Sequence, residues 1–329
     1  MTGADETEPP LPFTQRAEAR AKIAPHPAVI KPVPVTPRMD FRESFRFPRH
    51  GAYNTMNDNG VQFMAYIRRP AVAGAFYPGP AGELETAVKG YLAAAEAPVG
   101  EAVPKAIIAP HAGYIYSGPV AAAAYLRLAP AKDSITRVVL LGPCHRVLID
   151  GLALSAAEAF ATPLGDIPID RQAAGLISDM PQVRVFEAAH MDEHSLEVHL
   201  PFLQVVLADF SLVPLAVGRA SAVDVAEVLE KLWGGEETLI VVSSDLSHYL
   251  PYDEACELDA RTCKAVEALD GDAIGDAQAC GRIPMKGLLF EARRRQMSVS
   301  TVDLRNSGDT AGPRGQVVGY GAWIFREDG

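Results

Sequence analysis

The chain has 329 residues, of which 48% are hydrophobic and 22% are charged. These are ordinary globular values, and the length suits one large α/β domain or two small ones. A net charge of −11 without a basic run argues against general nucleic-acid binding. No apolar stretch approaches the roughly 20 residues of a membrane helix, and the acidic, polar start is not a secretory signal. We therefore expect a cytoplasmic protein that binds neither nucleic acid nor membrane.

The beginning of the chain is rich in proline, with eight prolines in the first forty residues and no apolar period. Such a segment cannot bury enough surface to offset the entropy lost on ordering. We therefore predict a disordered proline-rich tail over residues 1–67 and a single domain over residues 68–329.

From residue 68 onward, short apolar runs alternate with helical patterns. Helical spacing of apolar residues predicts helices over 83–95, 195–207, 223–232 and 254–269. The apolar runs cover 106–109, 138–141, 212–217, 239–242 and 299–304. Residues 317–325 alternate more, which predicts an edge strand or an antiparallel strand. Continuously apolar strands between helices predict an α/β fold with a central, largely parallel or mixed sheet and helices on both faces.

A histidine follows three of the apolar runs within a few residues. His111 follows the run at 106–109, His145 the run at 138–141, and His248 the run at 239–242. In open α/β sheets, ligands bind in the crevice beyond the carboxyl ends of the strands. We therefore expect these three histidines to lie at one crevice.

Neutral imidazole is the commonest metal ligand in proteins and suits iron, zinc and copper. Asp245 precedes His248 by three residues, a spacing that places both on one side of a helical turn. This pair could be two metal ligands, or a base and the residue that orients it. Cys280 lies in a loop-like segment before Gly281 and could be a small buried side chain or a thiolate ligand. The HExxH, GxSxG, P-loop and GxGxxG motifs are absent from the sequence.

Residues 192–197 read as the start of a helix, with Ser195 as the cap and acidic residues in the first turn. The functional alternative places Glu193 and His194 beside the crevice, where they orient a ligand or contact a substrate. Cys256 and Cys263 are seven residues apart on a predicted helix, and we expect both in the core.

Five motifs in this order resemble the Memo family, whose bacterial and archaeal members are called AmmeMemoRadiSam system protein B. They are APHAGYIYSG (109–118), LGPCH (141–145), DEHSLEVHLPF (192–202), VVSSDLSHY (241–249) and CGRIP (280–284). The resemblance covers roughly residues 68–326. It implies an α/β fold similar to class III extradiol dioxygenases, whose non-haem Fe(II) is held by two histidines and a carboxylate.

The resemblance also implies roles for single residues. His111 and His145 look like the two histidine ligands, and Cys280 looks like the third ligand, because the family holds a cysteine in place of the carboxylate. Asp245 and His248 match a pair lining the same pocket, with His248 in the position of the dioxygenase base. Some family members carry a second histidine after the first in GPxHH, and here that position is Arg146.

Two functions remain open on the sequence. The first is a metal-binding protein with redox or dioxygenase-type chemistry; its metal would be Fe(II) or copper, with zinc as a further candidate because a thiolate favours softer ions. The second is a non-enzymatic partner, binding a ligand or peptide, in a system with a radical SAM protein and an AMMECR-type protein. The sequence names no substrate and leaves open whether the chain is an enzyme.

Overall fold

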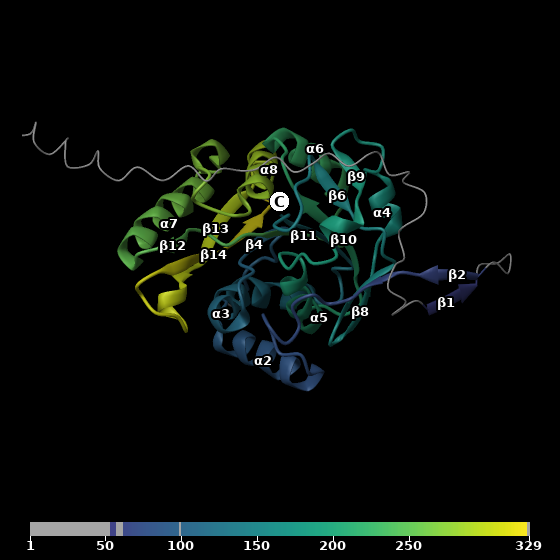
Figure 1. Ribbon diagram of the computed structural model, residues 1–329. Coiled ribbons are helices and arrows are strands. Elements are labelled where there is room, and N and C mark those ends of the chain that lie inside the picture. Colours follow the sequence, from purple (N-terminus) through teal and green to yellow (C-terminus); the bar gives the residue numbers. More distant parts are fainter. Residues whose placement is uncertain (1–52, 57–61, 99, 328–329) are drawn as a thin grey trace, which may run out of the picture. The chain divides into compact units, whose positions relative to one another are not determined.

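A mixed β-sheet carries the fold in the computed structural model of the protein, which describes residues 53–56, 62–98 and 100–327 (Figure 1). The strand order is β12-β14-β4-β11-β5-β10-β6-β9, and β13 pairs with β14. The four consecutive strands β4, β11, β5 and β10 are parallel to one another, whereas β14 and β6 on either side of them are antiparallel to β4 and β10. The bounds are β4 (Ala106–Ala109), β5 (Arg137–Pro143), β6 (Leu152–Leu154), β9 (Val183–Val185), β10 (Ser211–Val217), β11 (Thr238–Ser243), β12 (His248–Leu250), β13 (Ser298–Asn306) and β14 (Val317–Arg326).

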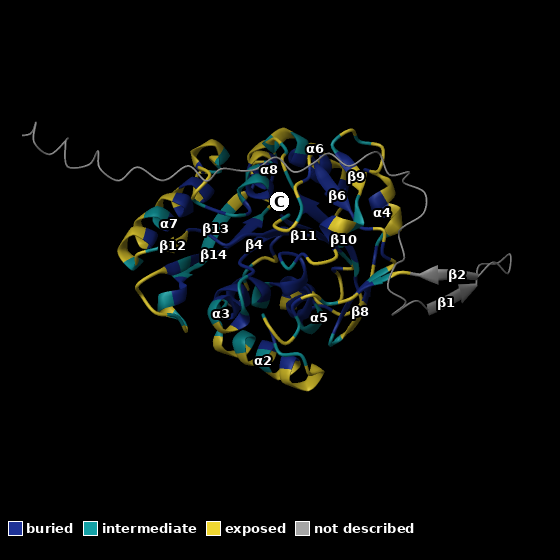
Figure 2. Ribbon diagram, in the orientation of Figure 1, coloured by how far each residue is buried: buried dark blue, intermediate teal, exposed yellow. Residues whose placement is uncertain are grey.

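Both faces of the sheet are covered by helices, because successive side chains of its apolar strands point to opposite faces. Ile107 packs in the core that includes α2, α3 and α5, whereas the next residue, Ile108, packs in the core that includes α6, α7 and α8. Figure 2 shows the buried strands between these helices. The predicted α/β class is therefore confirmed. The helices are α2 (Ala81–Ala94), α3 (Tyr114–Tyr125), α4 (Arg171–Gly175), α5 (Leu200–Val206), α6 (Ala222–Leu232), α7 (Tyr252–Glu267) and α8 (Arg282–Arg294).

Local sequence explains where helix α6 begins and how closely it packs. The Ser221 side chain accepts the backbone N–H of Asp224, whose carboxylate accepts the N–H of Ser221 in return. This reciprocal capping box satisfies two donors at the helix start. Gly287 of α8 faces α6, and a Cβ there would lie only 2.3 Å from Val225 Cγ1. The close approach of α6 and α8 therefore depends on glycine at this position.

Two predicted elements differ in detail from the structure. Residues 317–325 were predicted to form either an edge strand or an antiparallel strand. Strand β14 is antiparallel but not at an edge, because it pairs with β4 on one side and with β13 on the other. The helix predicted from residue 195 begins only at Leu200 as α5, after a 3₁₀ turn over Glu197–His199. The Ser195 hydroxyl, which was predicted to cap this helix, donates instead to the Pro143 carbonyl, and the Glu193 carboxylate accepts the backbone N–H of His145.

Two smaller sheets include residues that precede the main sheet. The first joins β3 (Ile67–Arg68), β7 (Ala159–Thr162) and β8 (Gly165–Pro168). The second pairs β1 (Tyr53–Met56) with β2 (Gln62–Ala65), which the sequence did not predict. The rest of the predicted tail, residues 1–52 and 57–61, lies outside the described residues. No helix within the described ranges has the length and apolarity needed to cross a membrane.

Candidate metal centre

Three side chains of metal-binding type converge at the carboxyl edge of the parallel strands. His111 follows β4, His145 follows β5, and Cys280 precedes α8. One ligand atom from each lies within 4.8 Å of the others. The carboxyl ends of neighbouring parallel strands open on one edge of a sheet, so β4 and β5 deliver their histidines to the same place.

The His111 ring is held in the tautomer that a metal requires. Its Nδ1 lies 2.5 Å from the hydroxyl oxygen of Ser243, and that hydroxyl donates its own proton to the Ser195 carbonyl at 2.6 Å. Nδ1 must therefore be the donor, which leaves the lone pair on Nε2, 3.4 Å from Cys280 Sγ. Burial, with the nearby imidazoles of His145 and His194, lowers the pKa of His111 well below its usual value. The ring is thus neutral at physiological pH.

Glu193 orients the second imidazole. Its carboxylate is buried, with one oxygen 2.9 Å from His145 Nδ1 and the other accepting the His145 backbone N–H at 2.5 Å. The Ser195 backbone N–H adds a third hydrogen bond at 2.9 Å. Burial raises the pKa of Glu193, but the hydrogen bonds and charge of His145 and the backbone N–H groups outweigh it and bring the pKa to about 2. An ionised carboxylate therefore holds the Nδ1 proton, and His145 Nε2 is left with the lone pair.

Cys280 is held against the end of β11 by backbone contacts. The Asp245 N–H donates to Cys280 Sγ at 3.3 Å, and the Cys280 N–H donates to the Asp245 carbonyl at 3.2 Å. A Cβ on Gly281 would lie 2.3 Å from the Ser243 carbonyl oxygen, so only glycine permits this approach. Burial and the charge of Asp245 raise the pKa of the Cys280 thiol to about 12. Without a cation beside it, the sulfur is therefore protonated, and a bound metal would displace the proton.

Asp245 and His248 do not share a helical turn, so that prediction is wrong. Asp245 lies in an irregular segment and His248 begins β12. The buried Asp245 carboxylate accepts the backbone N–H of His111 at 2.8 Å, while His248 Nδ1 donates to the Leu246 carbonyl at 2.8 Å. Burial raises the pKa of Asp245, against the opposing effects of the His111 N–H and the neighbouring histidines. His248 is exposed, and its charge acts on the pKa of both His111 and Asp245.

His194 completes a cluster of three imidazoles. Its ring centroid lies 4.8 Å from that of His145, in a stacked arrangement, and 5.4 Å from that of His111. Its Nδ1 lies 3.4 Å from a Glu193 oxygen. His145, Glu193 and His194 thus form a second group whose ligand atoms lie within 4.8 Å of one another. Both Glu193 oxygens already accept N–H groups, however, which suits an orienting carboxylate better than a metal ligand.

A buried arginine, Arg68, contacts the segment that carries Glu193 and His194, and sequence analysis did not predict it. Arg68 is only 1% exposed; it donates to the Glu193 carbonyl at 2.6 Å and to the His190 carbonyl at 3.0 Å. It also pairs with the buried carboxylate of Glu197, which accepts the backbone N–H groups of Ala71 and Val72. We call these contacts the Arg68–Glu197 clasp. It ties the start of the domain to the segment that carries Glu193 and His194, and no local pattern distinguishes Arg68 from its exposed neighbour Arg69.

Among the remaining cysteines, Cys263 is buried as predicted, whereas Cys256 is exposed, so the core prediction is wrong for it. Cys256 lies on the same helix, and its Sγ accepts a hydrogen bond from Asn306 Nδ2 at 3.4 Å. Seven-residue spacing places two side chains on one helix face but does not decide how far along the helix the core extends.

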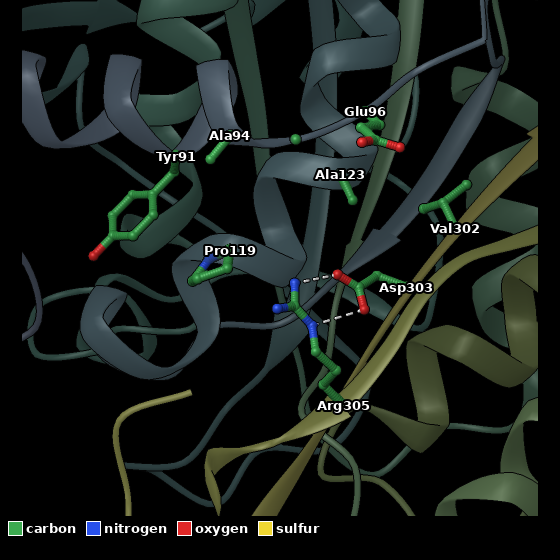
Figure 3. Close-up of a pocket in the computed structure, with 9 residues that line it drawn as sticks. Tyr91, Ala94, Glu96, Pro119, Ala123, Val302, Asp303 and Arg305 are labelled. Atoms are coloured by element: carbon green, nitrogen blue, oxygen red, sulfur yellow. Dashed lines mark hydrogen bonds and ion pairs between the residues drawn. The ribbon is translucent and has the colours of Figure 1, made fainter. Parts of the chain in front are cut away.

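A separate surface pocket of about 420 Å³ lies between α2, α3 and β13 (Figure 3). Arg305 pairs there with Asp303, which occupies two of its nitrogens. None of the candidate metal ligands lines this pocket. Its lining residues are Tyr91, Ala94, Ala95, Glu96, Pro119, Ala123, Val302, Asp303 and Arg305.

The fold and the cluster define an α/β protein with a candidate two-histidine, one-cysteine centre at the carboxyl edge of its parallel strands. The sequence model of the family described as Memo-like protein matches residues 68–324. The chain therefore belongs to the Memo family, which confirms the resemblance.

Two individual relatives, both MEMO1 family proteins, agree with this assignment. A MEMO1 family protein of Aquifex aeolicus is 37% identical over 270 residues, covering 79% of this chain and 99% of the relative. A second, from Methanothermobacter thermautotrophicus, is 35% identical over 276 residues, covering 77% of this chain and 98% of the relative. A solved structure of an uncharacterized protein from Escherichia coli K12 is similar with a TM-score of 0.43 at 15% identity, covering 67% of this chain and 98% of that one.

Proposed function

We propose that the protein binds one transition-metal ion through His111, His145 and Cys280. The observation that carries this proposal is the hydrogen bonding of the two imidazoles. Each has its Nδ1 proton engaged, by Ser243 in one case and by Glu193 in the other, and each is left with a lone pair on Nε2. Metal-ligating histidines almost always have the second ring nitrogen hydrogen-bonded in this way.

The donor set narrows the choice of metal. Two imidazoles and one thiolate suit Fe(II), copper or zinc, and three protein ligands leave coordination positions open for a substrate or for water. When bound, such an ion supplies redox or Lewis-acid chemistry at these open positions. Fe(II) and copper are the ions that would support the redox or dioxygenase-type activity expected from the family resemblance.

We further propose that His248 supplies a base to a ligand bound at this centre, because its charge acts on the pKa of His111. The Leu246 carbonyl can only accept, so His248 donates from Nδ1 and its Nε2 is free to take a proton. His248 is exposed, within reach of a ligand that enters from solvent. The buried Asp245 carboxylate holds the His111 backbone N–H, so it positions the loop that carries His111. We assign His248 as the catalytic base and Asp245 as a positioning residue.

Metal analysis of anaerobically purified protein tests the proposal. The wild-type chain should bind close to one equivalent of Fe(II), Cu(I) or Zn(II). Cys280→Ser should lose most of it, because a serine hydroxyl stays protonated near neutral pH and is a poor ligand. His248→Ala should keep its metal, and so should Cys256→Ser, which serves as the matched cysteine control. Full retention of metal by Cys280→Ser would refute the assignment.

A further inference from the structure

A buried carboxylate of helix α7 holds the segment that carries His248. Asp259 is only 3% exposed; its Oδ1 accepts the backbone N–H of Ser247 at 3.0 Å, and its Oδ2 accepts the Ser247 hydroxyl at 3.1 Å. Ser247 is also buried, and it directly precedes His248. Both donors of Ser247 therefore bind one carboxylate, and we call these two contacts the Asp259–Ser247 clamp.

Strand β14 holds the same segment through its backbone. The Leu246 N–H donates to the Gly319 carbonyl at 2.8 Å, and the Gly319 N–H donates to the Ser247 carbonyl at 2.8 Å. A Cβ on Gly319 would lie only 1.9 Å from Asp259 Oδ2, so the carboxylate reaches Ser247 because residue 319 is glycine. The segment is thus fixed by two elements, α7 and β14, that are distant from it in sequence.

The His248 imidazole is bound to this fixed segment. Its Nδ1 donates to the carbonyl of Leu246, the residue before Ser247. Tyr249, which follows His248, has a φ of 58°, a conformation that persists where the surrounding structure imposes it. The charge of His248 acts on the pKa of Asp259, although less than burial and the two Ser247 donors do. The clamp and the imidazole are therefore coupled by contacts and by charge.

We propose that Asp259 is a positioning residue for His248, because it clamps Ser247 and thereby fixes the imidazole that we assign as the base. A carboxylate suits this role, since its two oxygens accept both Ser247 donors at once. The inference rests on the proposed function, because it concerns the same base.

The buried carboxylate makes the strength of the clamp depend on pH. Burial raises the pKa of Asp259 to about 6, against the opposing effects of the Ser247 N–H and hydroxyl and of the His248 charge. When the segment opens, the carboxylate is hydrated and its pKa returns to about 4. The clamped state then binds the proton more tightly, so acidification stabilises the clamp and ionisation weakens it. Protection of the Ser247 N–H from hydrogen exchange should fall about tenfold between about pH 5 and pH 7 and change little above that.

Among the described residues, His248 is the only ionisable residue whose charge changes the pKa of Asp259. The other elements and neighbours packed against α7 carry further titratable or charged side chains, and none of these changes that pKa. They are Tyr249 of β12, Tyr320 and Arg326 of β14, Asp303 and Arg305 of β13, and Asp272 of the 3₁₀ turn over Gly271–Ala273. The pH dependence of the clamp should therefore follow Asp259 and, to a smaller extent, His248.

Hydrogen exchange and NMR of the ring nitrogens test the clamp on the full-length, metal-free chain. At about pH 8, His248 in the wild type should carry its proton on Nδ1. Asp259→Ala removes the acceptor, so the ring should lose this tautomer and the Ser247 N–H should exchange at least about tenfold faster. Asp259→Asn should restore both, because its amide oxygen accepts the Ser247 N–H and its NH2 donates to the hydroxyl oxygen. In Asp259→Asn, however, protection of the Ser247 N–H should no longer fall between about pH 5 and pH 7.

Two controls separate the clamp from general effects. Glu257→Ala removes an exposed acid of the same helix and should change neither readout. The Ala173 N–H, which the Asp170 carboxylate accepts at 2.8 Å, is the control within each sample. Burial raises the pKa of Asp170, but its hydrogen bonds with Ala173 and Arg137 outweigh burial and keep that pKa below its usual value. Protection of the Ala173 N–H should therefore stay constant over the same pH range.

A wild-type tautomer in Asp259→Ala, or a wild-type pH profile in Asp259→Asn, would overturn the role of Asp259. If Asp259→Ala does not fold, the pH profile of Asp259→Asn decides. A chain that binds no metal refutes the proposed metal site but leaves both readouts as predicted, so the two proposals fail independently.

Discussion

The Cys280 thiol shows how one residue couples metal binding to pH. Burial and the charge of Asp245 raise its pKa to about 12, so below that pH the metal must displace a proton to bind the sulfur. The low pKa of His111 means that this imidazole needs no deprotonation at neutral pH. The apparent affinity for Zn(II) should therefore rise about tenfold for each pH unit between about pH 7 and pH 9.

Chelator competition at several pH values measures this slope. Calorimetry in buffers of different ionisation enthalpy should show about one proton released for each Zn(II) bound. An affinity that does not change with pH would mean that the thiol is already ionised or does not bind the metal.

A second prediction at this scale concerns the carboxylate behind His145. Glu193→Gln removes the negative charge that holds the Nδ1 proton, and in either orientation its amide NH2 opposes the backbone N–H of His145 or that of Ser195. Zn(II) affinity should fall about 10- to 100-fold, as is usual for the loss of a partner that orients a ligand. The control is Glu158→Gln, a half-exposed carboxylate paired with Arg171. Wild-type affinity in Glu193→Gln would rule out the orienting role.

At the scale of elements, the site depends on segments that are distant in sequence. Strand β3 and the following residues are joined through the Arg68–Glu197 clasp to the 3₁₀ turn that precedes α5. Arg68→Met leaves the Glu197 carboxylate buried without its counter-charge. The free energy of unfolding should fall by about 3–5 kcal/mol, the usual cost of breaking a buried pair on one side.

Urea unfolding measures that loss. The exposed neighbour gives a matched control, since Arg69→Met should change the free energy of unfolding by no more than about 0.5 kcal/mol. Adding Glu197→Gln to Arg68→Met should recover part of the loss, because the unpaired charge is then removed. A double variant no more stable than Arg68→Met would show that packing, rather than the buried charge, dominates.

At the scale of the whole molecule, two cores lie on opposite faces of one sheet, and the described domain begins before residue 68. The Glu158 N–H donates to the Tyr66 carbonyl, and Ile67 pairs with Ala159 of β7. Deleting residues 1–52 should therefore change the thermal midpoint by less than about 5 °C, as their proline content suggests. Deletion through residue 67 should cost more. Equal midpoints for the two truncated chains would show that the pairing with β7 adds nothing to the stability.

Association with a radical SAM protein and an AMMECR-type protein stays a prediction.

The sequence alone was enough to predict the α/β class, the family and the three side chains of metal-binding type. Apolar runs, helical spacing and motif order are properties of neighbouring residues, so they can be read without the fold. Because ligands bind beyond the carboxyl ends of parallel strands, the sequence also predicted that His111 and His145 would lie at one edge of the sheet. At residues 192–197 the same reasoning left a helix start and a place beside the crevice both open, because a local pattern cannot tell an acid in a first helical turn from a buried one.

Only the tertiary structure decided which proton each imidazole carries and which charges are buried. The contacts of His111 with Ser243, and of Arg68 with Glu197, join residues more than 120 positions apart. Glu197, which was expected in the first turn of a helix, is buried and forms an ion pair with Arg68. Glu193 is also buried, and its carboxylate binds the His145 ring. These contacts depend on how distant segments pack, and packing rather than local propensity sets the protonation state and orientation of a buried polar group.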